Sequence, residues 1–154
     1  MKTRSVFRAA IAALALTFAC GAAFAGDVCD EGCTPGYWKQ AQHFDSWPAP
    51  YSPDSNLRDV FVTSPVELVP DDTFLEALNY SGGAGVGGAT RILLRAAVAS
   101  LLNSASPDVA FAVSTGHVVD TTISRIETQY RPTLLTRAAY FDSINNGPSG
   151  CPLD

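Results

Sequence analysis

The sequence predicts a mainly α protein with a single small helical domain of about four to five helices. Three observations lead to this fold class. Apolar residues recur with the helical period in several segments of the C-terminal half. Prolines and aromatic residues crowd an irregular N-terminal segment. Cysteines stand near both ends of the remaining chain, so a disulfide that links the termini is expected.

Residues 1–25 have the three parts of a signal peptide. Basic residues open the chain, an uncharged apolar run covers residues 9–19, and Ala23-Phe24-Ala25 matches the small-x-small pattern before a cut at Gly26. The run is too short for a membrane span. These features predict export to a secreted, extracellular or periplasmic location.

Cys20 offers an alternative, because a cysteine after a leader can carry a lipid anchor. The residues before it, Phe18 and Ala19, match that pattern poorly, so a lipid anchor is not favoured. Removing 25 of the 154 residues leaves 129, which is enough for one domain with its own core. The leader holds three of the ten basic residues and none of the 15 acidic ones, so the net charge falls from −5 to −8. Such a charge disfavours nucleic acid and anionic lipid as partners.

The domain 26–154 divides into three parts. Residues 26–70 form the irregular aromatic and proline-rich segment, residues 71–146 the helical core, and residues 147–154 a tail. Within the first part, Thr34 before Pro35 predicts the start of a short helix that ends near Asp45. Residues 60–62 are the one strand-like piece.

Four helices are expected in the core. The first is short, capped by Asp72, and a glycine-rich loop over residues 81–88 ends it. The most apolar helix covers about residues 89–105 and is expected to be the central one. A third covers about residues 115–130, with Val119, Ile123, Ile126 and Tyr130 on its apolar stripe. Pro132 opens the last, which continues to about Ile144.

Three cysteines remain after the leader is cut, and they allow three different single bridges. We favour Cys33–Cys151, because both lie in similar glycine- and proline-flanked settings and the bridge would close nearly the whole domain. Cys29 would then be a free thiol or would pair with another chain, which suggests a homodimer through Cys29.

Three segments resemble the signature of a family of exported bacterial proteins. They are Gly-Cys-Thr-Pro-Gly-Tyr-Trp-Lys at residues 32–39, Leu-Leu-Arg-Ala-Ala-Val-Ala-Ser-Leu-Leu-Asn at residues 93–103, and the ending around Gly150-Cys151-Pro152-Leu153. The resemblance implies export and a small helical domain at or outside the bacterial cell surface. It implies no activity and no catalytic residue. The chain departs from the family's usual Trp-Lys-Asn-His start, because Gln40-Ala41-Gln42 separate Lys39 from His43.

The aromatic residues of the irregular segment allow two interpretations. Exposed, they would form a binding platform for a protein or a sugar; buried, they would close one end of the helical core. Burial is favoured, because each ring buries a large apolar area. The platform residues would be Tyr37, Trp38, Phe44, Trp47 and Tyr51.

Candidate chemistry is sparse. The glycine-rich loop lacks the lysine of a phosphate-binding loop, and two histidines supply no readable catalytic triad. Cys29, Cys33, His43 and Asp45 cluster in sequence, but their spacing does not predict a metal site. Carboxylates remain as an alternative, because paired acids hydrolyse glycosides, and the candidates are Asp71 with Asp72, or Asp27, Asp30 and Glu31.

By elimination, the sequence favours a secreted or cell-surface binding or structural module over an enzyme. Its expected partner is an extracellular protein or glycan, and no cofactor is expected. A small extracellular hydrolase with paired carboxylates is the alternative.

Overall fold

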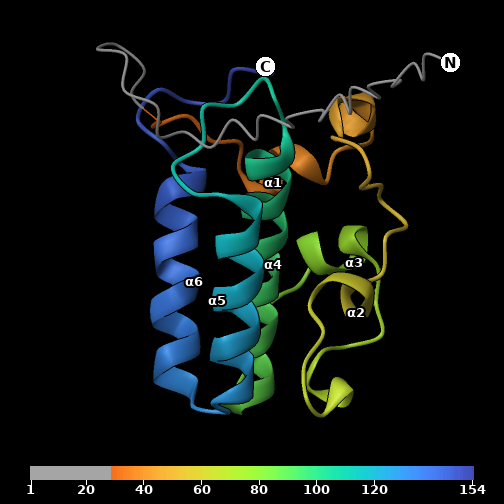
Figure 1. Cartoon of the computed structure of the whole chain (residues 1–154), viewed down its shortest axis with the longest axis vertical. Coiled ribbons are helices and arrows are strands. Elements are labelled where there is room, and N and C mark those ends of the chain that lie inside the picture. Colours follow the sequence, from red (N-terminus) through yellow and green to blue (C-terminus); the bar gives the residue numbers. More distant parts are fainter. Residues whose placement is uncertain (1–28) are drawn as a thin grey trace, which may run out of the picture.

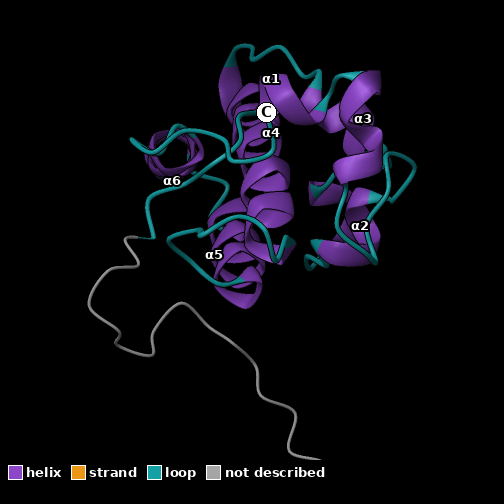
Figure 2. Cartoon of the chain, turned by 90° about the horizontal axis from the view of Figure 1, so that it is seen from above, coloured by secondary structure: helices purple, strands orange, loops and turns teal. Residues whose placement is uncertain are grey.

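The computed structural model describes residues 29–154, and it is helical. The leader predicted for residues 1–25, with Cys20, lies outside the described residues. Three long helices, α4, α5 and α6, stand side by side, and the short helices α2 and α3 cover the other side of α4 (Figures 1 and 2). The elements are α1 (Pro35–Trp38), a 3-10 turn η1 (Ala41–Ser46), α2 (Leu57–Val60), a 3-10 turn η2 (Val66–Leu68), α3 (Phe74–Leu78), α4 (Gly85–Ala105), α5 (Thr115–Glu127) and α6 (Arg131–Asn145).

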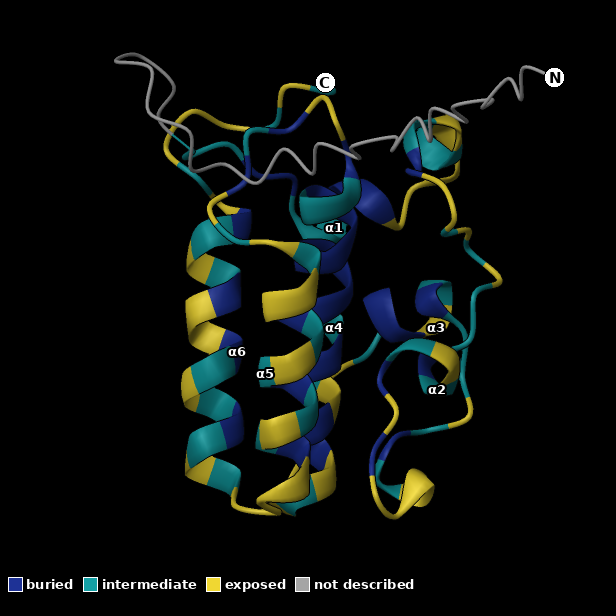
Figure 3. Cartoon of the chain, viewed as in Figure 1, coloured by how far each residue is buried: buried dark blue, intermediate teal, exposed yellow. Residues whose placement is uncertain are grey.

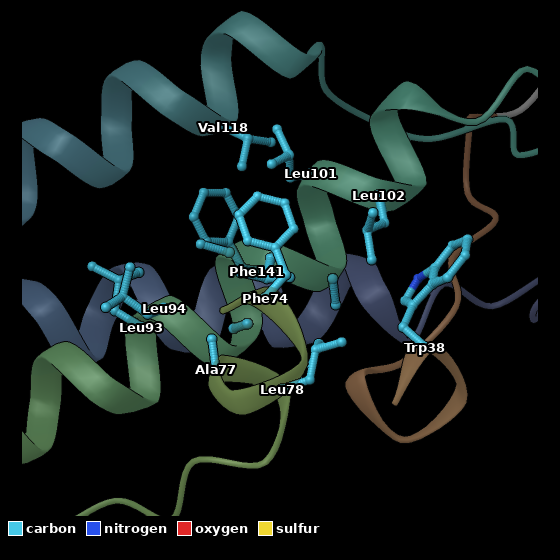
Figure 4. Close-up of a cluster of buried hydrophobic side chains, with 14 of the residues drawn as sticks. Trp38, Phe74, Ala77, Leu78, Leu93, Leu94, Leu101, Leu102, Val118 and Phe141 are labelled. Carbon is cyan, nitrogen blue, oxygen red and sulfur yellow. The ribbon is translucent and has the colours of Figure 1, made fainter. Parts of the chain in front are cut away.

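Helix α4 is the central element, as its apolar sequence predicts. It packs against α6, α5 and α3, and most of its side chains are buried (Figure 3). Within residues 29–154 it is the one helix long and apolar enough to cross a membrane, but 67% of its apolar window is buried inside the domain. The core helix of a globular domain has the same apolar composition, and here the packing of α3, α5 and α6 around α4 explains it. Leu93, Leu94, Leu101 and Leu102 meet Phe74 and Phe141 in the cluster of Figure 4.

Helix α4 begins at Gly85, four residues before the position expected from the sequence. The glycines that suggested a loop form its first turn instead. A Cβ atom at Gly88 would lie 2.2 Å from the carbonyl oxygen of Gly83, so the loop folds tightly over this turn. The close approach explains why glycine occupies a helical position here.

Helices α5 and α6 follow the predicted segments with one difference. Helix α5 ends at Glu127, because Gln129 takes a left-handed conformation with φ of 48°. Tyr130 therefore leaves the helix and is 58% exposed instead of lying on the apolar stripe. Val118, Thr122 and Ile126 are the residues of α5 that are buried.

The short elements correct three expectations. No strand forms at Val60–Val62 or elsewhere in residues 29–154, where only an isolated bridge joins Asn56 and Thr73. Helix α2 forms in the segment expected to be irregular, because the Asn56 side chain caps it by accepting from the Arg58 N–H. Helix α3 is capped by Thr73 and not by the expected Asp72, because Thr73 shares a capping box with Glu76.

A buried amide side chain joins three distant segments. The Oδ1 atom of Asn103 on α4 accepts from the Cys33 N–H and from the Trp38 indole N–H, both at 3.0 Å. Its Nδ2 donates to the Cys33 carbonyl at 2.9 Å and to Asn145 Oδ1 at 3.0 Å. All the hydrogen-bonding capacity of this amide is used inside the protein.

Asn145 at the end of α6 continues the network. Its Oδ1 also accepts from the Ser100 hydroxyl at 2.9 Å, and its Nδ2 donates to the Ala96 carbonyl at 2.9 Å. Asn103, Asn145 and Ser100 are fully buried. A satisfied buried network of this kind specifies one arrangement of the segments it joins.

The two ends of the domain are joined beside this network. The predicted Cys33–Cys151 disulfide is present and closes a sequence separation of 118 residues. The Gly32 N–H donates to the Gly150 carbonyl at 3.0 Å. A Cβ atom at Gly147 would lie 1.9 Å from the Asp30 carbonyl oxygen, so only glycine allows these two segments of the chain to approach this closely.

The expected role of Cys29 is corrected. Cys29 is disulfide-bonded, and residues 29–154 contain no free cysteine. An unpaired thiol at Cys29 is therefore not found, while the homodimer through Cys29 stays a prediction.

Replacing Asn103 with alanine should lower the free energy of unfolding by at least about 3 kcal/mol, because it leaves several buried polar groups without partners. Urea denaturation measures the change. Asn79→Ala is the control: the side chain of this exposed asparagine donates only to the Leu75 carbonyl, and its loss should change stability by less than about 1 kcal/mol. Similar small losses in both variants would contradict a central role for Asn103.

The double variant Cys33→Ser/Cys151→Ser should lose about 4–5 kcal/mol of stability, because the bridge closes almost the whole domain in the unfolded chain. Comparing urea midpoints of wild type and variant, with and without reductant, measures this loss. Reduction should destabilise only the wild type at this bridge. A variant as stable as oxidised wild type would show that the hydrogen bonds alone join the termini.

Candidate functional site

The aromatic side chains near the N-terminus do not form an exposed platform. Tyr37, Trp38 and Trp47 are buried, and Phe44 and Tyr51 are partly buried against the core. The Trp47 indole N–H donates to the Trp38 carbonyl at 3.1 Å, and the Tyr37 hydroxyl donates to the Leu153 carbonyl at 3.0 Å. The inward arrangement favoured by the sequence is therefore the one observed, and the five rings close one end of the core.

Asp71 and Asp72, two of the candidate carboxylates of a hydrolase, each hold the chain through a side-chain contact. Asp71 pairs with Arg58, with 3.5 Å between Oδ2 and Nη1, and Asp72 accepts from the Tyr80 hydroxyl at 2.6 Å. Burial, followed by the bond to Asp72, raises the pKa of Tyr80 well above its ordinary value.

The two acids near the N-terminus contact the chain in the same way. Asp30 accepts from the Ser149 hydroxyl at 2.7 Å, and Glu31 accepts from the Ala110 N–H at 2.7 Å. Asp27 lies outside the described residues. These contacts anchor the first described residues to the tail and to the loop before α5.

The two histidines make separate local contacts, and neither joins a cluster of possible metal ligands among the described residues. His43 stacks on Tyr37 with ring centroids 3.9 Å apart. His117 lies in the first turn of α5, where its N–H donates to the Ser114 hydroxyl. Within residues 29–154, no three His, Cys, Asp or Glu side chains come together as a metal site would require.

The glycine-rich loop is tied to α6 by an arginine. Arg131 donates to the Gly83 carbonyl at 3.1 Å and to the Gly85 carbonyl at 2.5 Å. The contact makes this loop a connection between α4 and α6, consistent with the absence of a phosphate-loop lysine in its sequence.

A groove lies along α6 beside the end of α5. It has a volume of about 530 Å³ and is lined by Arg125, Pro132, Thr133, Thr136, Arg137 and Tyr140. We call it the α5–α6 groove. Tyr140 is 38% exposed, and the Arg137 guanidinium lies over its ring at 5.1 Å and over Phe141 at 5.7 Å. The volume falls within the range of ordinary ligand sites, about 300–1,000 Å³.

The arginines of the α5–α6 groove have no acidic partner. Within residues 29–154 the one ion pair joins Arg58 and Asp71, on the opposite side of α4. Arg125 and Arg137 are therefore uncompensated cations on a chain with a net charge of −5, and they make the groove locally positive.

A second pocket, of about 400 Å³, lies where α1, the end of α3, α4 and α6 meet. We call it the α1–α4 pocket. Its charged residues are Lys39, Arg95 and Asp142. Arg95 Nη1 donates to the Tyr80 carbonyl at 3.3 Å, while its Nε is buried and has no hydrogen-bond partner. Burial raises the pKa of Asp142, and the positive charge of Arg95 opposes part of this rise.

Neither site was singled out in the sequence. The sequence did hold one signal for the groove. Outside the leader the acidic chain has seven arginines and lysines, and three of them lie close together at residues 125, 131 and 137. The α1–α4 pocket gave a weaker signal, since its charged residues lie in three distant segments. Comparisons with protein-family models, curated proteins and solved structures found no match for this chain.

The pH dependence of stability provides a test of the environment of Asp142. Because the folded-state pKa is raised, the folded chain binds its proton more tightly, so stability should fall as pH rises through the interval between the ordinary and the raised pKa. Asp142→Asn should remove this loss and be the more stable protein at neutral pH, with the difference shrinking in acid. Urea denaturation at several pH values measures it.

Asp54→Asn, at an exposed carboxylate, controls for the change in net charge. If Asp142→Asn is less stable than this control at neutral pH, the ionised Asp142 stabilises the fold through Arg95, and burial is not the larger effect.

Proposed function

We propose that this protein is an exported binding module, and that its α5–α6 groove receives an acidic segment of an extracellular partner protein. One observation carries the proposal: two arginines without acidic partners line a groove on an otherwise acidic chain. The chemistry of the groove therefore favours a ligand of negative charge, although the chain as a whole repels one at long range.

The residue types of the groove support a protein partner. Arginine and tyrosine are the side chains that most often dominate binding energy at protein interfaces. A guanidinium group binds a carboxylate through two parallel hydrogen bonds, which orients the partner as well as attracting it. Tyr140 and Pro132 add apolar surface beside the charges.

Export is supported by the sequence of residues 1–25 and by the disulfide. The Cys33–Cys151 bridge is compatible with an extracellular or periplasmic location, because such bonds persist in oxidising compartments. The resemblance of residues 32–39 and 93–103 to exported bacterial proteins points the same way. A bacterial cell-surface setting belongs to the proposal.

The two-carboxylate hydrolase gains no support from the pockets. The α5–α6 groove holds no carboxylate, the α1–α4 pocket holds Asp142, and a third pocket beside the start of α4 holds Glu67. Hydrolysis of a glycoside by this route needs two acids in one cleft. A binding role therefore fits these surfaces better.

A fluorescent glutamate-rich peptide should bind the purified mature protein, with an affinity that falls as salt is raised. The double variant Arg125→Gln/Arg137→Gln should weaken binding at least about tenfold, because each charged hydrogen-bonded pair contributes more than about 1.4 kcal/mol. Fluorescence anisotropy measures both effects.

Arg91→Gln is the matched control, because it removes the same charge from α4, where Arg91 lies over the Tyr80 ring. It should leave peptide binding within about twofold of wild type. Equal weakening by Arg91→Gln would show that only net charge matters and would contradict the groove. Tighter binding of polygalacturonate than of the peptide would replace the protein partner with an acidic glycan.

A further inference from the structure

The α1–α4 pocket is built partly from the segments that carry two of the three sequence motifs, and α6 supplies a further wall. Pro35, Gly36 and Lys39 belong to the first motif, and Arg95 belongs to the second. Asp142 lies on α6 just before Asn145, which the buried amide network holds against α4. The network and the disulfide therefore fix the position of the pocket walls relative to one another.

The two cations of the pocket have more donors than the protein satisfies. Lys39 is exposed and has no ion-pair partner among residues 29–154. Arg95 donates one hydrogen bond to the Tyr80 carbonyl, and this bond holds the loop after α3. That structural role does not account for the buried Nε, which is the one buried side-chain nitrogen or oxygen of the described residues without a hydrogen-bond partner. Such groups are rare, because an unsatisfied buried donor is costly.

Asp142 faces the same space with the opposite charge. The charge of Arg95 acts on its carboxyl group, yet the two side chains do not form an ion pair. Both groups line the pocket of about 400 Å³, which offers a ligand a guanidinium group and a carboxyl group. Leu78 and Pro35 supply apolar wall beside them.

We propose that the α1–α4 pocket binds a small carboxylic acid that also carries a hydroxyl or ammonium group, that is, a hydroxy acid or an amino acid. The ligand carboxylate lies against Arg95 and Lys39, whose guanidinium and ammonium donors match it. Its hydroxyl or ammonium group donates to Asp142. An aliphatic side chain on the ligand faces Leu78 and Pro35.

Inorganic phosphate fits the pocket less well. A phosphate dianion has no donor to offer Asp142, and its second charge is repelled by that carboxylate. A carboxylate carries one charge in a plane, which suits the planar guanidinium group. The inference does not depend on the α5–α6 groove, because the two sites share no residue.

The test compares two ligands that differ in one hydroxyl group. Titration of the full mature protein, followed by amide chemical shifts, should show saturable binding of 2-hydroxy-4-methylpentanoate and of leucine, with shifts at Lys39 and Asp142. The same acid without the hydroxyl, 4-methylpentanoate, should bind at least about tenfold more weakly, because Asp142 then lacks its donor. Inorganic phosphate should bind more weakly than either hydroxy or amino acid.

Two variants that leave the buried network intact assign the roles. Lys39→Gln should weaken both carboxylic acids about threefold to tenfold, and Asp142→Asn should reduce the preference for the hydroxylated ligand. Arg137→Gln, in the α5–α6 groove, should leave the affinities for the hydroxy acid and the amino acid unchanged. Binding at the α1–α4 pocket can therefore be tested separately from the proposed function of the groove.

Three outcomes would overturn the proposal. They are the absence of saturable shifts with both hydroxy and amino acid, tighter binding of phosphate, and an unchanged ligand preference in Asp142→Asn. Unaltered binding in Lys39→Gln together with Asp142→Asn would place the ligand elsewhere on the protein.

Discussion

The buried amide of Asn103 is the interaction on which the rest of the structure depends. It receives the backbone of Cys33 and the indole of Trp38 on one side and the amide of Asn145 on the other. Central helix, first helix and last helix therefore meet at one side chain. Because each polar group there is buried and paired, sliding any segment by one residue would leave several of them without partners.

This constraint explains why the conspicuous residues of the sequence are structural. Trp38 and the cysteine pair lie beside the network, and the close approach at Gly147 helps to hold the two ends of the domain together. Most of the aromatic side chains are buried in the core or packed against it. The surfaces left for recognition are consequently lined by arginines, a lysine and partly exposed rings, which drew less notice in the sequence.

The spacing of apolar residues and prolines predicted helices correctly where no local contact competed with it. The long apolar segment became the central helix, and proline marked the start of α6 within one residue. Periodicity failed where a local contact competed with it. The first turn of α4 contains glycines because the preceding loop folds closely over Gly88, and α5 ends early because Gln129 turns left-handed. The cap at Asn56 starts α2, which the pattern of apolar residues did not predict, whereas α3 forms in its expected segment with Thr73 as its cap.

The sequence alone determined the helical class and the central helix, because these follow from the local period of apolar residues. It favoured the Cys33–Cys151 bridge among three possible ones, because these cysteines stand at both ends of the domain, and the structure contains this bridge. It also established the acidic charge and the leader pattern. Only the tertiary structure decided which polar residues matter, because Lys39, Arg95 and Asp142, or Arg125 and Arg137, become neighbours through the crossing of helices. A one-dimensional pattern records spacing within an element, whereas a binding site is made by side chains of different elements at distances that only packing sets.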